Sequence, residues 1–337
     1  TALAQIGDSQ AISALIKASS NPNDRFVEHA VIYALITLRE PAALIQALSD
    51  SAVNTGKPAL IALDQMDGSP LKKDQLAPFL NSENDQLQNA GIWVARHHHN
   101  WADVVVDFLK HNLNAGNLSA DQQASMRNLM IAFSADAQMQ QFITAQLSNK
   151  ALALPVRKLL LDVIQHAAVG KLPDTWIKQL GNLLQDNDHE IRSEVLNVIK
   201  SRRIASLNNE LNRIAGDAKT PTDFRLKALS ARLMSEPKLS DAEFEIVSSY
   251  LGPKNEFPVR QEASRLLTQA KLGEAQLITL ASEQVTTADV FLLPYLINAY
   301  KGGRSEVAGK ALITALEATK DRLENLSVPD MQKLFSS

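Results

Sequence analysis

Residues 155–164 (PVRKLLLDVI) begin with an apolar residue followed by arginine and continue as an apolar, helix-forming segment. Counted from Val156, apolar residues recur at the fourth, seventh and eighth positions, which are Leu160, Val163 and Ile164. Residues at these spacings share one face of an α-helix. The segment therefore predicts a helix that buries a single apolar stripe.

The same pattern recurs through the second half of the chain. Apolar-arginine pairs stand at Ile191-Arg192, Phe224-Arg225 and Val259-Arg260, and the arginines from Arg157 onward are 35, 33 and 35 residues apart. That period is typical of repeats that contain two helices each. A weaker form of the pattern extends toward the N-terminus. The repeat-start positions form one series: 28, 57, 88, 127, 157, 192, 225 and 260.

Shorter amphipathic segments separate these helices and predict the second helix of every repeat. They span residues 9–18, 41–48, 73–80, 101–113, 137–147, 173–184, 206–214, 241–251 and 274–281. Ser119 and Ser240 are expected N-caps, and Pro294 is expected to kink or end a helix over 288–300. One helix pair cannot bury both of its faces, so successive pairs must stack. The sequence predicts an all-α fold, an α-solenoid of about nine helix-pair repeats that forms a single array over residues 1–337.

Composition excludes several classes of function. The chain has 34 basic and 37 acidic residues, and this net charge of −3 argues against nucleic acid as a partner. The chain has no cysteine, which removes thiolate nucleophiles, disulfides and thioether attachment of haem. No apolar run reaches the roughly 18 residues that a membrane span needs, so we expect no direct membrane insertion. We find no nucleophile elbow, phosphate-binding glycine loop or zinc-protease helix, and predict a non-enzyme without catalytic residues or a cofactor.

Two resemblances to known families follow from these motifs. The apolar-arginine start with a preceding acid, as in Asp223-Phe224-Arg225, resembles the HEAT repeat. The segments 24–35 (DRFVEHAVIYAL), 59–66 (ALIALDQM) and 92–97 (IWVARH) are more specific. They resemble the HEAT-repeat section of large multidomain haem-binding proteins of planctomycete and verrucomicrobial bacteria, which are often called membrane-bound dehydrogenases. The specific resemblance is confined to the N-terminal part of the chain.

This resemblance implies a function as a scaffold that spaces or docks redox domains. In that family a β-propeller domain similar to sugar dehydrogenases precedes the helical array, and a small c-type cytochrome domain follows it. The implied partners are proteins, either neighbouring domains or another chain, and the implied location is the periplasm or cell envelope, which suits the absence of cysteine. The chain itself has no Cys-x-x-Cys-His motif to carry the family's haem chemistry. Because both ends, at Thr1 and after Val328, interrupt apolar helical patterns, we expect a fragment of a longer protein.

A different class of function, a HEAT-like enzyme of the DNA-glycosylase type, would require a coherent cationic groove. The candidate residues are Lys200, Arg202, Arg203, Arg213, Lys219, Arg225, Lys227 and Arg232. Acidic residues such as Glu194 and Asp217 lie among them, and Phe224 is the one aromatic residue in the stretch. The pattern therefore favours ordinary solvated helix faces over a nucleic-acid site.

Three consecutive histidines, His97, His98 and His99, are the candidates for a metal site. Imidazoles bind transition metals, and three of them in an irregular turn could converge on one ion. Consecutive residues of a helix point about 100° apart and could not do so. We predict a helix end without a metal, and expect the neighbouring Trp93 and Trp101 to be core anchors.

The arginines at the repeat starts, Arg157, Arg192, Arg225 and Arg260, could be interpreted as an anion-binding ladder. Their fixed place in successive repeats favours a structural role instead. We expect them to stack on and hydrogen-bond to the next repeat, as the HEAT resemblance implies.

Overall fold

The computed structural model contains helices and no strand in the residues that it describes, so the all-α prediction is confirmed. These residues are 5–8, 10–18, 25–49, 53–114, 118–301 and 305–319. None of the helices among them combines the length and apolar character that a membrane crossing requires. The chain forms two compact units, Thr1–Trp176 and Ile177–Ser337, and the boundary falls within α12 (Asp174–Leu183). The single array over 1–337 stays a prediction.

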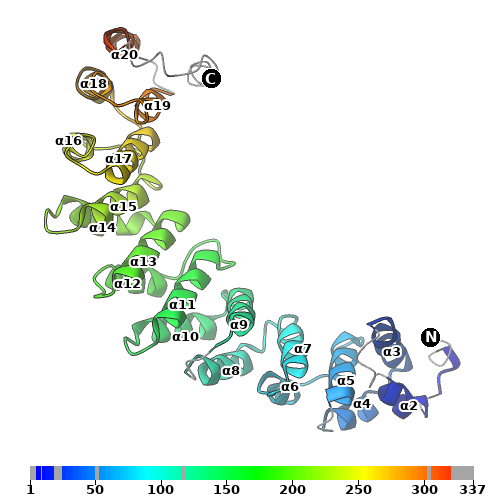
Figure 1. Ribbon diagram of the computed structural model, residues 1–337. Coiled ribbons are helices and arrows are strands. Elements are labelled where there is room, and N and C mark those ends of the chain that lie inside the picture. The colour runs from blue at the N-terminus through cyan, green and yellow to red at the C-terminus, as the bar shows by residue number, and fades with distance from the viewer. Residues whose placement is uncertain are drawn as a thin grey trace. The chain divides into compact units, whose positions relative to one another are not determined.

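Unit 1 consists of two rows of stacked helices (Figure 1). The first row contains α2 (Ala11–Ala18), α4 (Pro41–Leu48), α6 (Lys73–Leu80), α8 (Ala102–Asn114) and α10 (Ala137–Ser148). The second row contains α3 (Arg25–Leu38), α5 (Val53–Gln65), α7 (Asp85–Ala95), α9 (Ala120–Ala132) and α11 (Leu154–His166). In the second row α3 packs on α5, α5 on α7, α7 on α9 and α9 on α11, while α4 and α6 pack on α5 and α7. Each helix therefore contacts mainly its neighbours in the stack.

Unit 2 continues the same alternation (Figure 1). Its second-row helices are α13 (His189–Arg202), α15 (Thr222–Leu233), α17 (Phe257–Gln269) and α19 (Leu293–Asn298). The helices between them are α14 (Asn208–Gly216), α16 (Asp241–Ser249) and α18 (Glu274–Thr279), and α20 (Glu306–Ala318) follows α19. A 3₁₀ turn, η1 (Ala205–Leu207), leads into α14, and a π-helical segment, η2 (Leu280–Val285), extends α18. Here α13 packs on α15, α15 on α17 and α17 on α19.

The predicted N-caps are confirmed. The hydroxyl of Ser119 accepts a hydrogen bond from the backbone N–H of Gln122, and the Gln122 side chain accepts one from the backbone N–H of Ser119. Ser240 and Glu243 form the same reciprocal pair at the start of α16. Such capping boxes satisfy N–H groups that have no partner within the helix.

The prediction that Pro294 kinks or ends a helix over 288–300 is wrong. Helix α19 begins at Leu293, so Pro294 lies in its first turn and neither kinks nor ends a helix. The segment before it is a turn, in which the Asp289 carboxylate accepts hydrogen bonds from the backbone N–H groups of Phe291 and Leu292. Proline suits the first turn of a helix because the N–H that it lacks would have no helical partner there.

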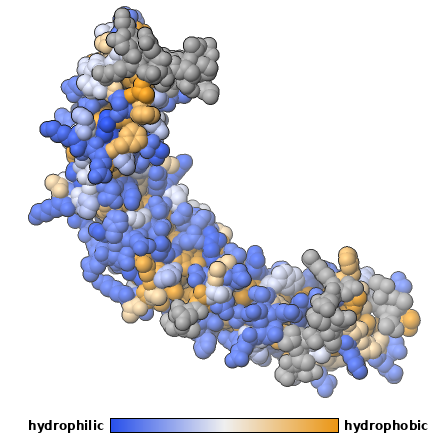
Figure 2. Space-filling model, viewed as in Figure 1, coloured by the Kyte–Doolittle hydropathy of each residue, from blue (hydrophilic) through white to orange (hydrophobic). Residues whose placement is uncertain are grey.

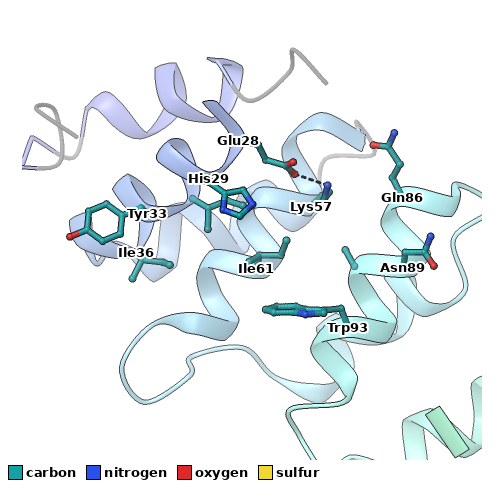
Figure 3. Close-up of a pocket in the computed structure, with 11 residues that line it drawn as sticks. Glu28, His29, Tyr33, Ile36, Lys57, Ile61, Gln86, Asn89 and Trp93 are labelled. Carbon is teal, nitrogen blue, oxygen red and sulfur yellow. Dashed lines mark ion pairs between the residues drawn. The ribbon is translucent and has the colours of Figure 1, made fainter. Parts of the chain in front are cut away.

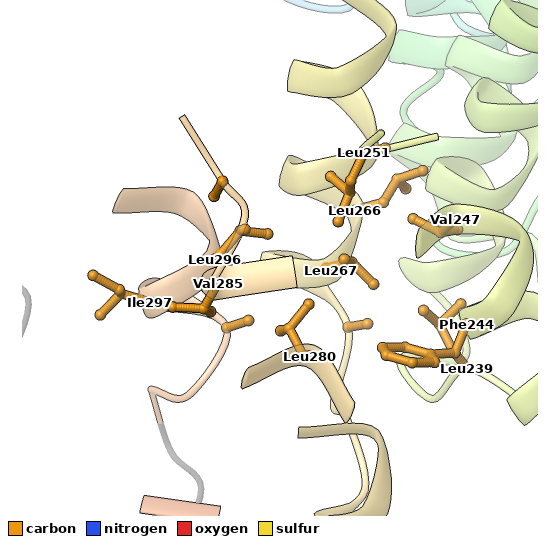
Figure 4. Packing of buried hydrophobic residues seen from close by; sticks show 14 of the residues in the cluster. Leu239, Phe244, Val247, Leu251, Leu266, Leu267, Leu280, Val285, Leu296 and Ile297 are labelled. Atoms are coloured by element: carbon orange, nitrogen blue, oxygen red, sulfur yellow. The ribbon is translucent and has the colours of Figure 1, made fainter. Parts of the chain in front are cut away.

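The predicted apolar stripe forms the core. Leu160, Val163 and Ile164 of α11 are fully buried, and so are the corresponding residues of the other second-row helices. In unit 2, Leu266 and Leu267 of α17 lie between residues of α16, such as Phe244, and residues of the following helices (Figure 4). The stripe of one helix is thus covered by its own first-row partner and by the adjacent repeat.

Arg232 occupies a stripe position in α15 where the repeat pattern calls for an apolar residue. Its side chain is only 2% exposed. The guanidinium donates hydrogen bonds to the backbone carbonyls of Glu236 and Lys238, at 3.1 and 2.9 Å, and lies 3.1 Å from a carboxylate oxygen of Glu243. Arg232 therefore ties the loop between α15 and α16 to the core, and its charge is paired, as a buried charge must be.

We predict that shortening either of two stripe residues strongly destabilises the chain. Leu160→Ala and Ile199→Ala should each lower the free energy of unfolding by about 2–5 kcal/mol, because both side chains are buried and leave a cavity. Ile313→Ala is the matched control, since Ile313 of α20 is 58% exposed, and should change stability by less than about 0.5 kcal/mol. Chemical denaturation followed by circular dichroism measures all three. Equal effects at buried and exposed sites would contradict the assignment of the buried face.

Candidate functional site

A groove with a volume of about 870 Å³ lies on the second-row helices of unit 1 (Figure 3). Helices α3 and α7 line its two sides, and α5, which packs against both, lies between them. The lining residues are Glu28, His29, Ile32, Tyr33 and Ile36 from α3, Lys57 and Ile61 from α5, and Gln86, Asn89, Ala90 and Trp93 from α7. We call this site the α3–α5–α7 groove.

Two aromatic side chains of the groove are exposed to solvent. Tyr33 is 61% exposed and Trp93 is 41% exposed. The indole of Trp93 extends from α7 toward Ile61, whereas Tyr33 lies at the far edge of α3 (Figure 3). Large aromatic residues are enriched at protein interfaces because they bury much area and lose little conformational entropy.

The acidic and basic side chains that line the groove, those of Glu28 and Lys57, are paired with each other. Glu28 and Lys57 form an ion pair of 2.6 Å between α3 and α5, with about a quarter of each side chain exposed. At the α7 edge the side-chain amides of Gln86 and Asn89 have no hydrogen-bond partner within the part of the chain that the structure describes. These amides can donate to and accept from a ligand without a change of net charge.

The aromatic residues occupy one fixed place in the repeat. Tyr33 stands five residues after repeat-start position 28, and Trp93 stands five residues after position 88. The same place holds a small or polar residue in the other repeats, namely Ala62, Ala132, Asp162, Asn197, Ser230 and Arg265. The groove is therefore a local feature of α3 and α7, since Ala62 and Ser230 at the same place are buried. The aromatic residues at this register were the sequence signal for it.

Close packing of α7 on α6 fixes the direction of Trp93. Gly91 lies so near α6 that a β-carbon in its place would be 3.0 Å from the backbone nitrogen of Leu80. Gly91 thus faces α6, and Trp93, two residues later, lies about 200° around the helix. The indole consequently points away from the core.

Comparison with known proteins identifies the fold. No family model and no curated protein sequence matches the chain. Among solved structures, the karyopherin Kap121p has a TM-score of 0.65 at 11% identity, over 97% of this chain and 41% of Kap121p. Kap121p bound to Nup53p gives 0.64 at 12% identity, over 97% and 40% of the two chains. Kap121p bound to the extreme C-terminus of the phosphatase Cdc14p gives 0.63 at 12%, over 97% and 41%.

The fold is a HEAT-type α-solenoid. This confirms the predicted fold class. The chain spans about two fifths of the length of the karyopherin chains that it matches. At this level of identity the similarity to these solenoids concerns the fold alone.

Of the three candidate histidines, His97 and His98 both approach Asp64, and His99 points elsewhere. His98 Nε2 lies 2.5 Å from Asp64 Oδ1, and the His98 ring stacks on Trp101 with 3.7 Å between ring centroids. His99 faces Phe133 instead, with its ring centroid 5.8 Å away. Within the described ranges no three His, Asp or Glu side chains are placed to hold a metal ion together. His98 and Asp64 instead join the turn after α7 to the end of α5.

The two neighbouring tryptophans differ in their surroundings. Trp101 is buried, so the prediction of a core anchor is confirmed for it. The same prediction is wrong for Trp93, whose indole lines the groove. His97 packs edge-on against Trp93, with 4.3 Å between ring centroids, and its Nδ1 lies 3.4 Å from the buried Asp64 carboxylate. His97, which follows Trp93 by about one helical turn and lies beside Asp64, therefore packs against the indole and restricts its position.

In unit 2 the arginines at the repeat starts contact the following repeat, and two of them also donate a hydrogen bond to a carbonyl of the preceding segment. The guanidinium of Arg192 lies over the Phe224 ring, 4.9 Å from its centroid. Arg225 donates hydrogen bonds to the Ala215 carbonyl and, at 2.6 Å, to the hydroxyl of Tyr250. Two further contacts belong to Arg260, which donates to the Leu251 carbonyl and pairs with Asp289 at 2.7 Å. In unit 1, Arg157 is buried and only 6% exposed.

Four residues of the basic stretch in unit 2 make similar contacts with neighbouring residues. Arg232 is buried in the core, and Arg225 is bound to Tyr250. Lys200 donates a hydrogen bond to Ser230 at 2.7 Å, and Lys227 lies 3.7 Å from an Asp223 carboxylate oxygen. These four cations make their contacts within unit 2.

We predict that Tyr250→Phe destabilises the chain by about 1.5 kcal/mol, because the Arg225 guanidinium loses a hydrogen-bond acceptor between two repeats. Tyr33→Phe removes the same atom from an exposed ring and should leave the unfolding free energy unchanged. Urea titrations of both variants measure the difference. A Tyr250→Phe variant as stable as Tyr33→Phe would show that this contact contributes nothing.

Proposed function

We propose that the chain is a non-catalytic scaffold that binds a segment of another protein in the α3–α5–α7 groove. The observation that carries this proposal is the pair of exposed aromatic residues, Tyr33 and Trp93, on either side of Ile61 in one groove. Exposed apolar patches of this kind mark binding surfaces in soluble proteins. Hydrophilic residues dominate the face seen in Figure 2, against which apolar patches stand out.

The fold is compatible with this function. Stacked helix pairs present long surfaces for binding. Three of the solved structures with this fold are complexes of Kap121p, with Nup53p, with the C-terminus of Cdc14p and with the SUMO protease Ulp1p. These complexes concern Kap121p, and our proposal rests on the groove of this chain.

The proposed scaffold would space or dock the redox domains of a larger dehydrogenase-cytochrome protein, as the resemblance of residues 24–35, 59–66 and 92–97 implies. The gene that encodes this chain should then also encode a β-rich domain upstream and a Cys-x-x-Cys-His segment downstream, with export to the periplasm or cell envelope. Sequencing of the complete reading frame tests this part of the proposal. A complete frame without a haem-binding motif would contradict the redox assignment and leave the scaffold proposal intact.

Selection from a display library of random peptides on the immobilised chain tests the binding function. We expect enriched peptides whose affinity falls by about tenfold or more with Trp93→Ala, since central aromatic residues dominate the energy of most interfaces. Asn197→Ala is the matched control, because Asn197 occupies the same place in another repeat and is exposed. Circular dichroism shows that both variants fold. Enrichment of no peptide, or only of peptides indifferent to Trp93→Ala and Tyr33→Ala, would refute a binding function of this groove.

A further inference from the structure

Helix α3 carries two apolar stripes. The first, with Val31, Ala34 and Leu35, is buried in the core. The second contains His29, Ile32, Tyr33 and Ile36 and lines the groove. Its members are spaced as i, i+3, i+4 and i+7, which is the spacing of a helix face that packs against another helix. The core of unit 1 covers this second face only in part, since His29 and Tyr33 are exposed and Ile32 and Ile36 are half-buried.

Helix α7 presents a face with the same spacing across the groove. Gln86, Asn89, Ala90 and Trp93 again stand at i, i+3, i+4 and i+7. Two helix-packing faces therefore lie on either side of α5, which contributes Ile61 between them (Figure 3).

The spacing of the three helices fits a fourth helix. Packed helix axes lie about 8–10 Å apart, so the axes of α3 and α7 are separated by roughly 16–20 Å across α5. A helix laid above α5 at that distance has its axis roughly 11–14 Å from the axes of α3 and α7, so it would reach both sides through large side chains such as Tyr33 and Trp93. Along the groove, the nine residues from Glu28 to Ile36 span about 12 Å, or two helical turns of a ligand. An extended strand is narrower and would leave part of the groove uncovered.

Charge further restricts the ligand. Glu28 and Lys57 neutralise each other at one end of the groove, so the ligand face that enters it should be uncharged. Glu28, Lys57 and Gln86 all belong to the first two turns of their helices, which places the N-termini of α3, α5 and α7 at that same end. Aligned helix dipoles favour a neighbouring helix that runs in the opposite direction.

We propose that the ligand of the α3–α5–α7 groove is an amphipathic α-helix of a partner protein. It lies antiparallel to α5 and inserts an uncharged apolar stripe between Tyr33 and Trp93. This inference rests on the proposed binding function and specifies its partner. The amides of Gln86 and Asn89 bind polar side chains at the edge of that stripe.

Two synthetic peptides of equal composition test the inference. Each has about 15 residues, enough for some helix in isolation. The first places leucines at i, i+3, i+4 and i+7 among alanine, glutamine and lysine, and the second places the same leucines at every other position. Trp93 reports binding directly, because Trp101 and Trp176 are buried while Trp93 is exposed. We expect a blue shift of tryptophan emission and micromolar binding for the first peptide, and binding at least about tenfold weaker for the second.

Variants of the full chain locate the site. Trp93→Ala and Ile61→Ala should each weaken binding of the first peptide by about tenfold, and Asn197→Ala should not change it. Calorimetry measures all three variants, because Trp93→Ala lacks the fluorescent reporter. A photoreactive group at the N-terminus of the peptide should label the C-terminal halves of α3, α5 and α7 if the orientation is antiparallel. Labelling of their N-terminal halves would overturn the orientation.

The outcomes separate this inference from the binding function. Equal binding of the two peptides, or tighter binding of the alternating one, would overturn the helical ligand. Random peptides that bind through Trp93 but alternate in polarity would likewise overturn it, while the scaffold proposal would stand. Failure of both the patterned peptides and the random library would overturn both.

Discussion

Every second-row helix has an apolar stripe that its own first-row partner covers only in part. Leu160 and Ile164 of α11, and Leu266 and Leu267 of α17, are fully buried in the stack, where α11 packs on α9 and α17 packs on α15 and α19. This requirement produces the stack, because each added pair covers one stripe and brings another that needs covering. In α3 and α7 the stack leaves part of the helix surface outside the core, and that surface carries Tyr33 and Trp93. Side chains there can change without loss of core packing.

The sequence predicted the helices well because their signal is local. The positions of Leu160, Val163 and Ile164 follow from a spacing that any helix imposes, and the Ser119 and Ser240 caps depend on residues three positions away. Arg232 could not be interpreted in this way. Its partners are loop carbonyls and Glu243, which meet it only after the chain has turned back on α15. Pro294 was misjudged because the Asp289 turn, which starts α19 late, leaves no trace in the apolar pattern.

The groove was missed although part of its signal was present. Counted from Leu87, the apolar stripe of α7 includes Gly91, Val94 and Ala95, and Trp93 lies off that stripe. The size of an indole suggested a core anchor, but the spacing placed it outside the core. The sequence could not show which residues lie next to Trp93 in space. Trp93 forms a site only because Ile61 of α5 lies beside it and Tyr33 of α3 lies beyond Ile61. Composition gave no hint of a ligand, since the ion pair of Glu28 with Lys57 contributes no net charge.

The α3–α5–α7 groove is encoded by one continuous stretch of chain, from Arg25 to Ala95, with its two aromatic residues at the same register in alternate repeats. Recombination in steps of one repeat keeps the stacking surfaces matched, since each pair rests on its neighbours. A duplication of this stretch would therefore create a second groove in the same register, whereas one repeat inserted between α5 and α7 would move Trp93 out of reach of Ile61. Gene rearrangement within such an array can copy or dismantle this surface in a single event while the fold is retained.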